Sequence, residues 1–183
     1  KLMAQYEPPK KTGHVFGDLV IGPKGQVFVS DSKTNEIYVV NEKTQALDRF
    51  FVSTDFWNLQ GLAFSDDGRY LFISDYIKGP FRLEISSRKL IKIKSEVENS
   101  LKGIDGLLFY KGTLLALQNG TMPLRVMRFW LNSSLDAVAA AEIVDQGRAE
   151  LNEPTQGNLG GNHLYYVANS QWGGHDKDHQ PKP

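Results

Sequence analysis

Short runs of apolar residues, separated by tight polar turns, recur along this chain of 183 residues. Each run is short, tends to alternate between apolar and polar positions, and is bounded by Gly, Asp or Asn, which is typical of β-strands joined by hairpins. The pairs Lys24-Gly25 and Asp67-Gly68 stand where a hairpin turn needs a positive φ. The pattern therefore predicts an all-β chain.

Four segments repeat one order: a Gly, an apolar strand, a polar turn, and a second apolar run that ends near Asp or Asn. The glycines that open them are Gly17, Gly61, Gly106 and Gly157, so the spacings are 44, 45 and 51 residues. Periods of about 40 to 50 residues with several strands each are typical of β-propeller blades. The predicted fold is a β-propeller of four-stranded antiparallel blades with about four blades. Because the last repeat ends soon after its second strand, we interpret the chain as the C-terminal part of a larger propeller.

The repeats suggest a division into a short polar segment, a partial propeller and a flexible tail. The polar segment is 1–13, the propeller is 14–172, and the tail is 173–183. Within the propeller, the repeats are expected near 14–56, 57–100, 101–148 and 149–172.

Third and fourth strands complete each expected blade. Residues 81–85 alternate strictly and predict a half-buried third strand. Residues 89–94, with lysines among apolar residues, predict an outer edge strand. Residues 134–143 include four alanines and have helix propensity, but we favour a strand because 125–129 needs a partner.

Composition narrows the function classes. Lys plus Arg and Asp plus Glu both number 21, so the formal net charge is zero, which argues against a nucleic-acid partner. No apolar run approaches the roughly 20 residues that span a bilayer, so no membrane span is expected. The absence of Cys excludes thiol chemistry and leaves oxygen or imidazole ligands for any metal.

Blade geometry predicts which polar side chains meet. The start of an innermost strand and the end of the second strand lie at one face of a propeller, where oxygen ligands can converge on a small polar molecule or a cation. The residues expected there are Asp31, Gln60, Asp75, Asp105, Asn119, Gln156 and Asn169. Asp31 and Asp75 have an alternative role, which is to cap turns by accepting backbone N–H groups.

Three further features are ambiguous. Trp172, just beyond the last strand, either lines the opening or packs over the core, and Glu153 is either a ligand near the opening or a solvated loop charge. His175 and His179 have the i, i+4 spacing of a zinc pair, but the flanking glycines and prolines favour a flexible tail.

Two phrases carry a family resemblance. The stretch 61–75 (GLAFSDDGRYLFISD) and the stretch 104–107 (IDGL) resemble the six-bladed propellers of the SMP-30/gluconolactonase/LRE-like group. NHL-repeat and strictosidine-synthase-like proteins share that architecture. The resemblance runs from about His14 to Trp172.

The resemblance implies a divalent cation, commonly Ca²⁺, at the mouth of the central channel. Its ligands in the family are acid or amide side chains before the Gly-Leu of the innermost strands. Asp105 matches the Asp that is both ligand and general base, and Gln60 stands where the family has Asn. Gly17 replaces a further amide, and the family's Glu ligand would lie N-terminal to residue 1.

The resulting hypothesis is a cation-dependent hydrolase of lactones or related esters. Asp105 would take a proton from the attacking water, while Asn119, Asn169, Gln156 and Trp172 would contact the substrate. Covalent catalysis is disfavoured because no Ser stands in a Gly-x-Ser-x-Gly setting. One alternative is a non-catalytic, NHL-like binding or scaffold module. Another is a strictosidine-synthase-like fold that needs no metal. The open sheet edges of a partial ring are expected to self-associate.

Overall fold

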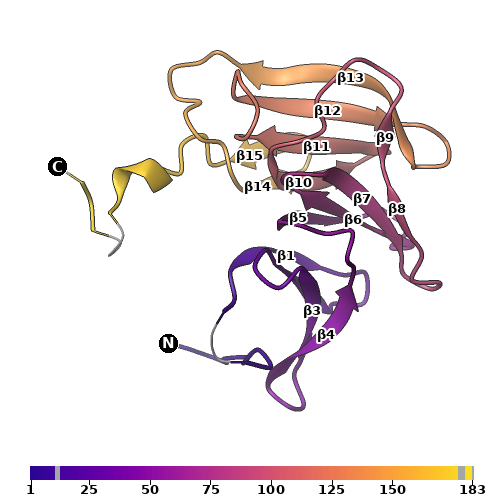
Figure 1. The fold of residues 1–183 in the computed structure, drawn as a ribbon, viewed down its shortest axis with the longest axis vertical. Coiled ribbons are helices and arrows are strands. Elements are labelled where there is room, and N and C mark those ends of the chain that lie inside the picture. Colours follow the sequence, from indigo (N-terminus) through magenta and orange to yellow (C-terminus); the bar gives the residue numbers. More distant parts are fainter. Residues whose placement is uncertain (11–12, 177–179, 183) are drawn as a thin grey trace.

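The computed structural model describes residues 1–10, 13–176 and 180–182, and almost all of its regular structure is β-strand. Three sheets each contain a meander of four antiparallel strands, and a fourth contains two (Figure 1). The strands of the first sheet are β1 (Phe16–Ile21), β2 (Val27–Asp31), β3 (Glu36–Asn41) and β4 (Ala46–Val52). The second sheet contains β5 (Leu59–Phe64), β6 (Tyr70–Asp75), β7 (Gly79–Glu84) and β8 (Leu90–Lys92).

The third sheet has a fifth strand. It contains β10 (Ile104–Tyr110), β11 (Thr113–Gln118), β12 (Arg125–Leu131) and β13 (Ala137–Gln146), and β9 (Lys94–Ser95) pairs with β13 in parallel. The fourth sheet contains β14 (Gly157–Gly160) and β15 (His163–Tyr166), and a short 3₁₀ turn, η1 (Trp172–Gly174), follows it. The four sheets follow one another around an arc, so the prediction of four-stranded antiparallel blades is confirmed for the first three repeats (Figure 1).

The hydrophobic core lies between successive sheets. Successive side chains of a strand point to opposite faces of its sheet, so one strand serves two interfaces. In β6, Leu71 and Ile73 pack toward the first sheet, whereas Phe72 packs toward the third. Leu117 and Val126 of the third sheet pack on Leu164 and Tyr166 of the fourth. Each blade is therefore stabilised chiefly by its neighbours.

Two expectations about individual strands need correction. The strand in 81–85 is buried on both faces, because Arg82 lies over the Tyr70 ring at 4.4 Å and donates a hydrogen bond to the Ser134 carbonyl of the next blade. The expected edge strand 89–94 ends at Lys92, because Ile93 turns into the core between the second and third sheets. The strand preferred over a helix at 134–143 is confirmed as β13.

Candidate functional site

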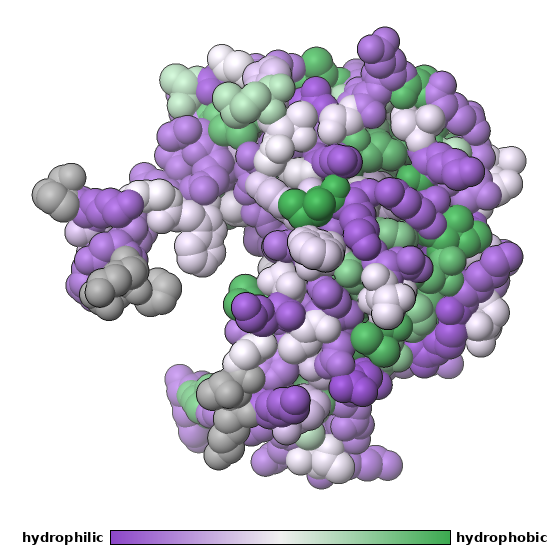
Figure 2. Space-filling model, in the orientation of Figure 1, coloured by the Kyte–Doolittle hydropathy of each residue, from purple (hydrophilic) through white to green (hydrophobic). Residues whose placement is uncertain are grey.

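The innermost strands begin close together, and their first polar residues face one pocket. Gln60 and Asp105 are the second residues of β5 and β10, and Gln156 immediately precedes β14. All three line a pocket of about 610 Å³, together with Asn119 and Trp172. The structure thus brings together five of the residues expected at the opening, whereas Asp31, Asp75 and Asn169 do not line this pocket. Figure 2 shows the molecule hollowed between the N-terminal sheet and the C-terminal segment.

Glycines allow this close approach. A Cβ built on Gly61 would lie 2.5 Å from the backbone nitrogen of Leu107, and one on Gly106 would lie 2.1 Å from the carbonyl oxygen of Thr155. No side chain fits at either distance, so the glycines that follow Gln60 and Asp105 set the spacing between these blades.

Asp105 is held from one side. The Nδ2 group of Asn119 donates a hydrogen bond of 2.7 Å to Oδ2 of Asp105, and the hydroxyl of Tyr76 donates one of 2.8 Å to Oδ1 of Asn119. Burial raises the pKa of Asp105, with a contribution from the charge of Glu153, while the bond from Asn119 opposes the rise. Burial and the charges of Asp105 and Glu153 also raise the pKa of Tyr76, so its hydroxyl keeps its proton.

Glu153 is a second carboxylate in this pocket. It is half-buried, and its Oε2 accepts the backbone N–H of Trp172 at 2.8 Å. Its backbone has a φ of +133°, which non-glycine residues rarely adopt and which is found at functional sites. Of the two interpretations of Glu153, the structure therefore favours a place at the opening over a solvated loop charge.

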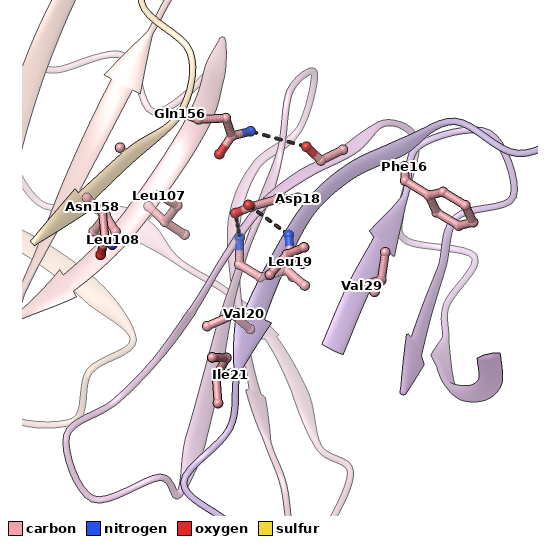
Figure 3. A pocket seen from close by; sticks show the side chains of 13 residues that line it. Phe16, Asp18, Leu19, Val20, Ile21, Val29, Leu107, Leu108, Gln156 and Asn158 are labelled. Atoms are coloured by element: carbon pink, nitrogen blue, oxygen red, sulfur yellow. Dashed lines mark hydrogen bonds between the residues drawn. The ribbon is translucent and has the colours of Figure 1, made fainter. Parts of the chain in front are cut away.

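The side-chain NH₂ groups of Gln60 and Gln156 donate hydrogen bonds to neighbouring residues. Nε2 of Gln60 donates to Oδ1 of Asn58 at 2.6 Å, and Nε2 of Gln156 donates to the carbonyl of Gly17 at 3.1 Å (Figure 3). The second bond joins the last repeat to the first. Each bond uses one of the two N–H donors of the amide, and the Oε1 atom of each glutamine is an acceptor for a ligand.

Asn169 lies in an adjoining pocket of about 580 Å³ rather than beside Asp105. Asn119 and Glu153 line both pockets, and Oδ1 of Asn169 accepts the backbone N–H of Gln171 at 3.1 Å. Trp172 lines the main pocket with 68% of its surface exposed, so it does not pack over the core.

Asp31 and Asp75 do not line either pocket, which corrects the expectation that they join the opening. Asp75 accepts the backbone N–H groups of Trp57, Asn58, Ile77 and Lys78 at 2.6 to 3.0 Å. Asp31 accepts N–H groups in the same way and pairs with Nδ1 of His14 at 2.5 Å. Their alternative role as turn caps is confirmed.

A further carboxylate was not among the sequence-predicted site residues. Asp18 lines a pocket of about 640 Å³ along the inner strands and accepts the N–H groups of Leu62 and Leu19 at 2.9 and 2.8 Å (Figure 3). Burial raises the pKa of Asp18 to about 6, against the effect of these two bonds and with a small contribution from Asp105. Its position one residue after Gly17 was the available signal.

The raised pKa of Asp18 predicts a stability change with pH. Between the ordinary pKa of 3.8 and about 6, the folded chain binds more protons than the unfolded chain, so the free energy of unfolding should fall as pH rises. At about 1.4 kcal/mol per pKa unit, the loss approaches about 3 kcal/mol. Urea denaturation at pH 4 to 7 in EDTA should show this loss in the wild type relative to Asp18→Asn. If the free energy of unfolding changes with pH to the same extent in both proteins, the prediction is wrong.

No group of three or more His, Asp or Glu side chains suited to a metal occurs within the described ranges. His179 of the suggested zinc pair lies outside those ranges. No helix in the described part of the chain is long and apolar enough to cross a bilayer.

Solved structures with the same fold include enzymes and a protein complex. A gluconolactonase from Xanthomonas campestris matches with a TM-score of 0.65 and 17% identity, covering 90% of this chain and 57% of its own. A virginiamycin B lyase from Staphylococcus aureus matches with a TM-score of 0.64 and 16% identity, covering 88% of this chain and 51% of its own. A chain of a nidogen/laminin complex matches with a TM-score of 0.60 and 14% identity, covering 84% of this chain and 72% of its own. No family model and no curated protein sequence matches the chain.

These likenesses show that the four sheets match about half of a six-bladed β-propeller. The chain has the propeller fold seen in SMP-30/gluconolactonase-type structures, and it spans about half the length of most of the solved structures it matches. The prediction of a partial six-bladed propeller is confirmed. At such low identities the likeness shows the fold alone, because one fold supports many activities.

Proposed function

We propose that the protein is a divalent-cation-dependent hydrolase of lactones or related esters, with Asp105 as the general base. The observation that carries the proposal is the position of Asp105 in a pocket of suitable size, with Oδ2 held by Asn119 at 2.7 Å. A carboxylate with a raised pKa is better matched to proton transfer near neutral pH than an ordinary one.

The donor chemistry of the pocket fits a hard cation such as Ca²⁺. Asp105 and Glu153 supply carboxylate oxygens, Gln60 and Gln156 supply amide oxygens, and none of the described lining residues is Lys, Arg or His. Asp105 and Gln60 would hold the ion, and Glu153 is a further candidate ligand. Because carboxylates supply most of the affinity for Ca²⁺, this donor set supports modest rather than tight binding. When bound, the ion would offset the repulsion between the carboxylates, polarise the substrate carbonyl and acidify water.

The chain's own residues account for the proton transfers. Asp105 takes a proton from a water molecule as that water attacks the carbonyl carbon, and a tetrahedral intermediate forms. The proton then passes to the ring oxygen as the carbon–oxygen bond breaks, so the lactone becomes a hydroxy acid. Substrate hydroxyls would bind to the side-chain amides of Gln156, Asn119 and Asn169. Trp172 would cover one face of the substrate.

The charge of the two pockets favours a neutral substrate. The described residues that line them include two carboxylates, Asp105 and Glu153, and no basic side chain. Together the two carboxylates would balance the charge of one divalent ion, so the occupied site would have no net charge, which suits a neutral lactone.

The alternative function is a non-catalytic binding module. The match to a nidogen/laminin complex supports it, because that structure shows the fold within a protein assembly. A strictosidine-synthase-like site that needs no metal is a third possibility. Self-association through open sheet edges, where Phe16, Leu19 and Ile21 of β1 are exposed, remains a prediction.

Lactone hydrolysis tests the proposal. A panel of neutral γ- and δ-lactones is assayed by proton release at pH 7, first in excess Ca²⁺ and then in EDTA. We expect hydrolysis above the spontaneous rate that EDTA removes and added Ca²⁺ restores. A rate that never exceeds the spontaneous one would reject the hydrolase and favour the binding module, and EDTA-resistant hydrolysis would favour the metal-free possibility.

A further inference from the structure

A chain of two hydrogen bonds joins the second blade to Asp105. Tyr76 directly follows β6, and its hydroxyl donates to Oδ1 of Asn119 at 2.8 Å. Asn119 follows β11 in the third blade, and its Nδ2 donates to Oδ2 of Asp105 at 2.7 Å. The two hydrogen bonds thus lead from a residue of the second blade to the candidate general base in the third.

These two hydrogen bonds have only one favourable direction of donation. An ionised carboxylate only accepts hydrogen bonds, so Asp105 requires the NH₂ group of Asn119 to face it. The carbonyl oxygen of Asn119 then points away and needs a donor, which the hydroxyl of Tyr76 supplies. Rotating the amide by half a turn would direct its oxygen at the carboxylate.

The surrounding backbone leaves space for the Tyr76 ring. A Cβ on Gly120 would lie 2.6 Å from both Cζ and the hydroxyl oxygen of Tyr76, and a Cβ on Gly103 would lie 2.5 Å from the carbonyl carbon of Gly120. The backbone N–H of Gly103 also donates to the carbonyl of Tyr76 at 2.8 Å. Two glycines therefore let the ring approach Asn119, and the ring has few alternative positions.

We propose that Tyr76 is a positioning residue: through Asn119 it fixes the Asp105 carboxylate, with one oxygen held by Asn119 and the other left for the cation and the reacting water. Tyr76 itself does not touch the reacting atoms. The inference rests on the proposed function for its effect on hydrolysis, whereas the hydrogen-bond chain can be observed without any activity.

The first test observes Asn119 directly. The side-chain NH₂ signals of Asn119 are assigned in the ¹H–¹⁵N spectrum of the wild type and compared with Tyr76→Phe, which keeps the ring and loses the hydroxyl. We expect these signals to move toward those of a free amide. Tyr110→Phe is the matched control, since Tyr110 donates a 2.8 Å bond to Oδ1 of Asn162 from the other end of β10 and should leave Asn119 unchanged. Unchanged Asn119 signals in Tyr76→Phe would overturn the inference.

The second test is a double-mutant cycle on lactone hydrolysis. Tyr76→Phe should lower kcat about tenfold with little change in KM, which is the effect expected from one hydrogen bond. In an Asn119→Ala background, the same substitution should change kcat less than about twofold, because its effect passes through Asn119. An equal loss in both backgrounds would overturn the inference. If the wild type hydrolyses no lactone, the proposed function fails, and the Asn119 spectrum alone decides this inference.

Discussion

Replacing Asp105 with Asn should lower kcat for lactone hydrolysis by about 10² to 10⁴, the range that a positioned general base contributes. Asn has nearly the same shape but cannot take the proton from the attacking water. The substitution also leaves the Nδ2 group of Asn119, which donates to Asp105 at 2.7 Å, without a carboxylate acceptor. Initial rates over a range of lactone concentrations would give the change in kcat.

Asp66→Asn is the matched control for charge. Asp66 is exposed in the turn at the opposite end of β5 from Gln60, so the same loss of one negative charge should leave kcat unchanged. Full activity in Asp105→Asn, or an equal loss in both variants, would show that Asp105 is not the base.

Replacing Gly106 with Ala should lower the free energy of unfolding by about 3 to 5 kcal/mol, which is large for one methyl group. The added Cβ would lie 2.1 Å from the carbonyl oxygen of Thr155, a backbone atom that cannot move without displacing the start of the fourth sheet. Because Gly106 follows Asp105, the same displacement should disturb the pocket. Urea denaturation followed by circular dichroism measures the change in stability.

Gly112→Ala provides the comparison. Gly112 has a φ of +76° and no atom within 4 Å of a Cβ, so the substitution adds backbone strain of about 1 to 2 kcal/mol without a collision. Equal stability of the two variants would contradict the close packing of the inner strands.

Much of the fold could be predicted because the blade pattern is local. Alternating apolar residues and turn pairs such as Asp67-Gly68 specify strands and hairpins within a few residues of sequence. Burial of the strand in 81–85 could not be predicted in the same way, because it depends on the Ser134 carbonyl of the next blade. The early end of the strand at Lys92 likewise depends on the interface into which Ile93 packs.

The candidate site shows the same division. Gln60, Asp105 and Gln156 could be placed together because each stands at the start of an innermost strand. The contacts that Tyr76 and Asp18 make could not be predicted, because each side chain meets a residue of a different blade. Tyr76 meets Asn119 across 43 positions of sequence, and Asp18 meets the Leu62 amide across 44. No local pattern reports such contacts.

Thermal melting with and without Ca²⁺ tests the central claim most directly, since it needs no knowledge of the substrate. At 100 times its dissociation constant, Ca²⁺ should add about 2.7 kcal/mol, which corresponds to roughly 5 to 10 °C for a chain of this size. We expect this shift in the wild type and in Asp66→Asn, and its loss in Asp105→Asn. An absent shift in the wild type, or a full shift in Asp105→Asn, would contradict a cation site built on Asp105.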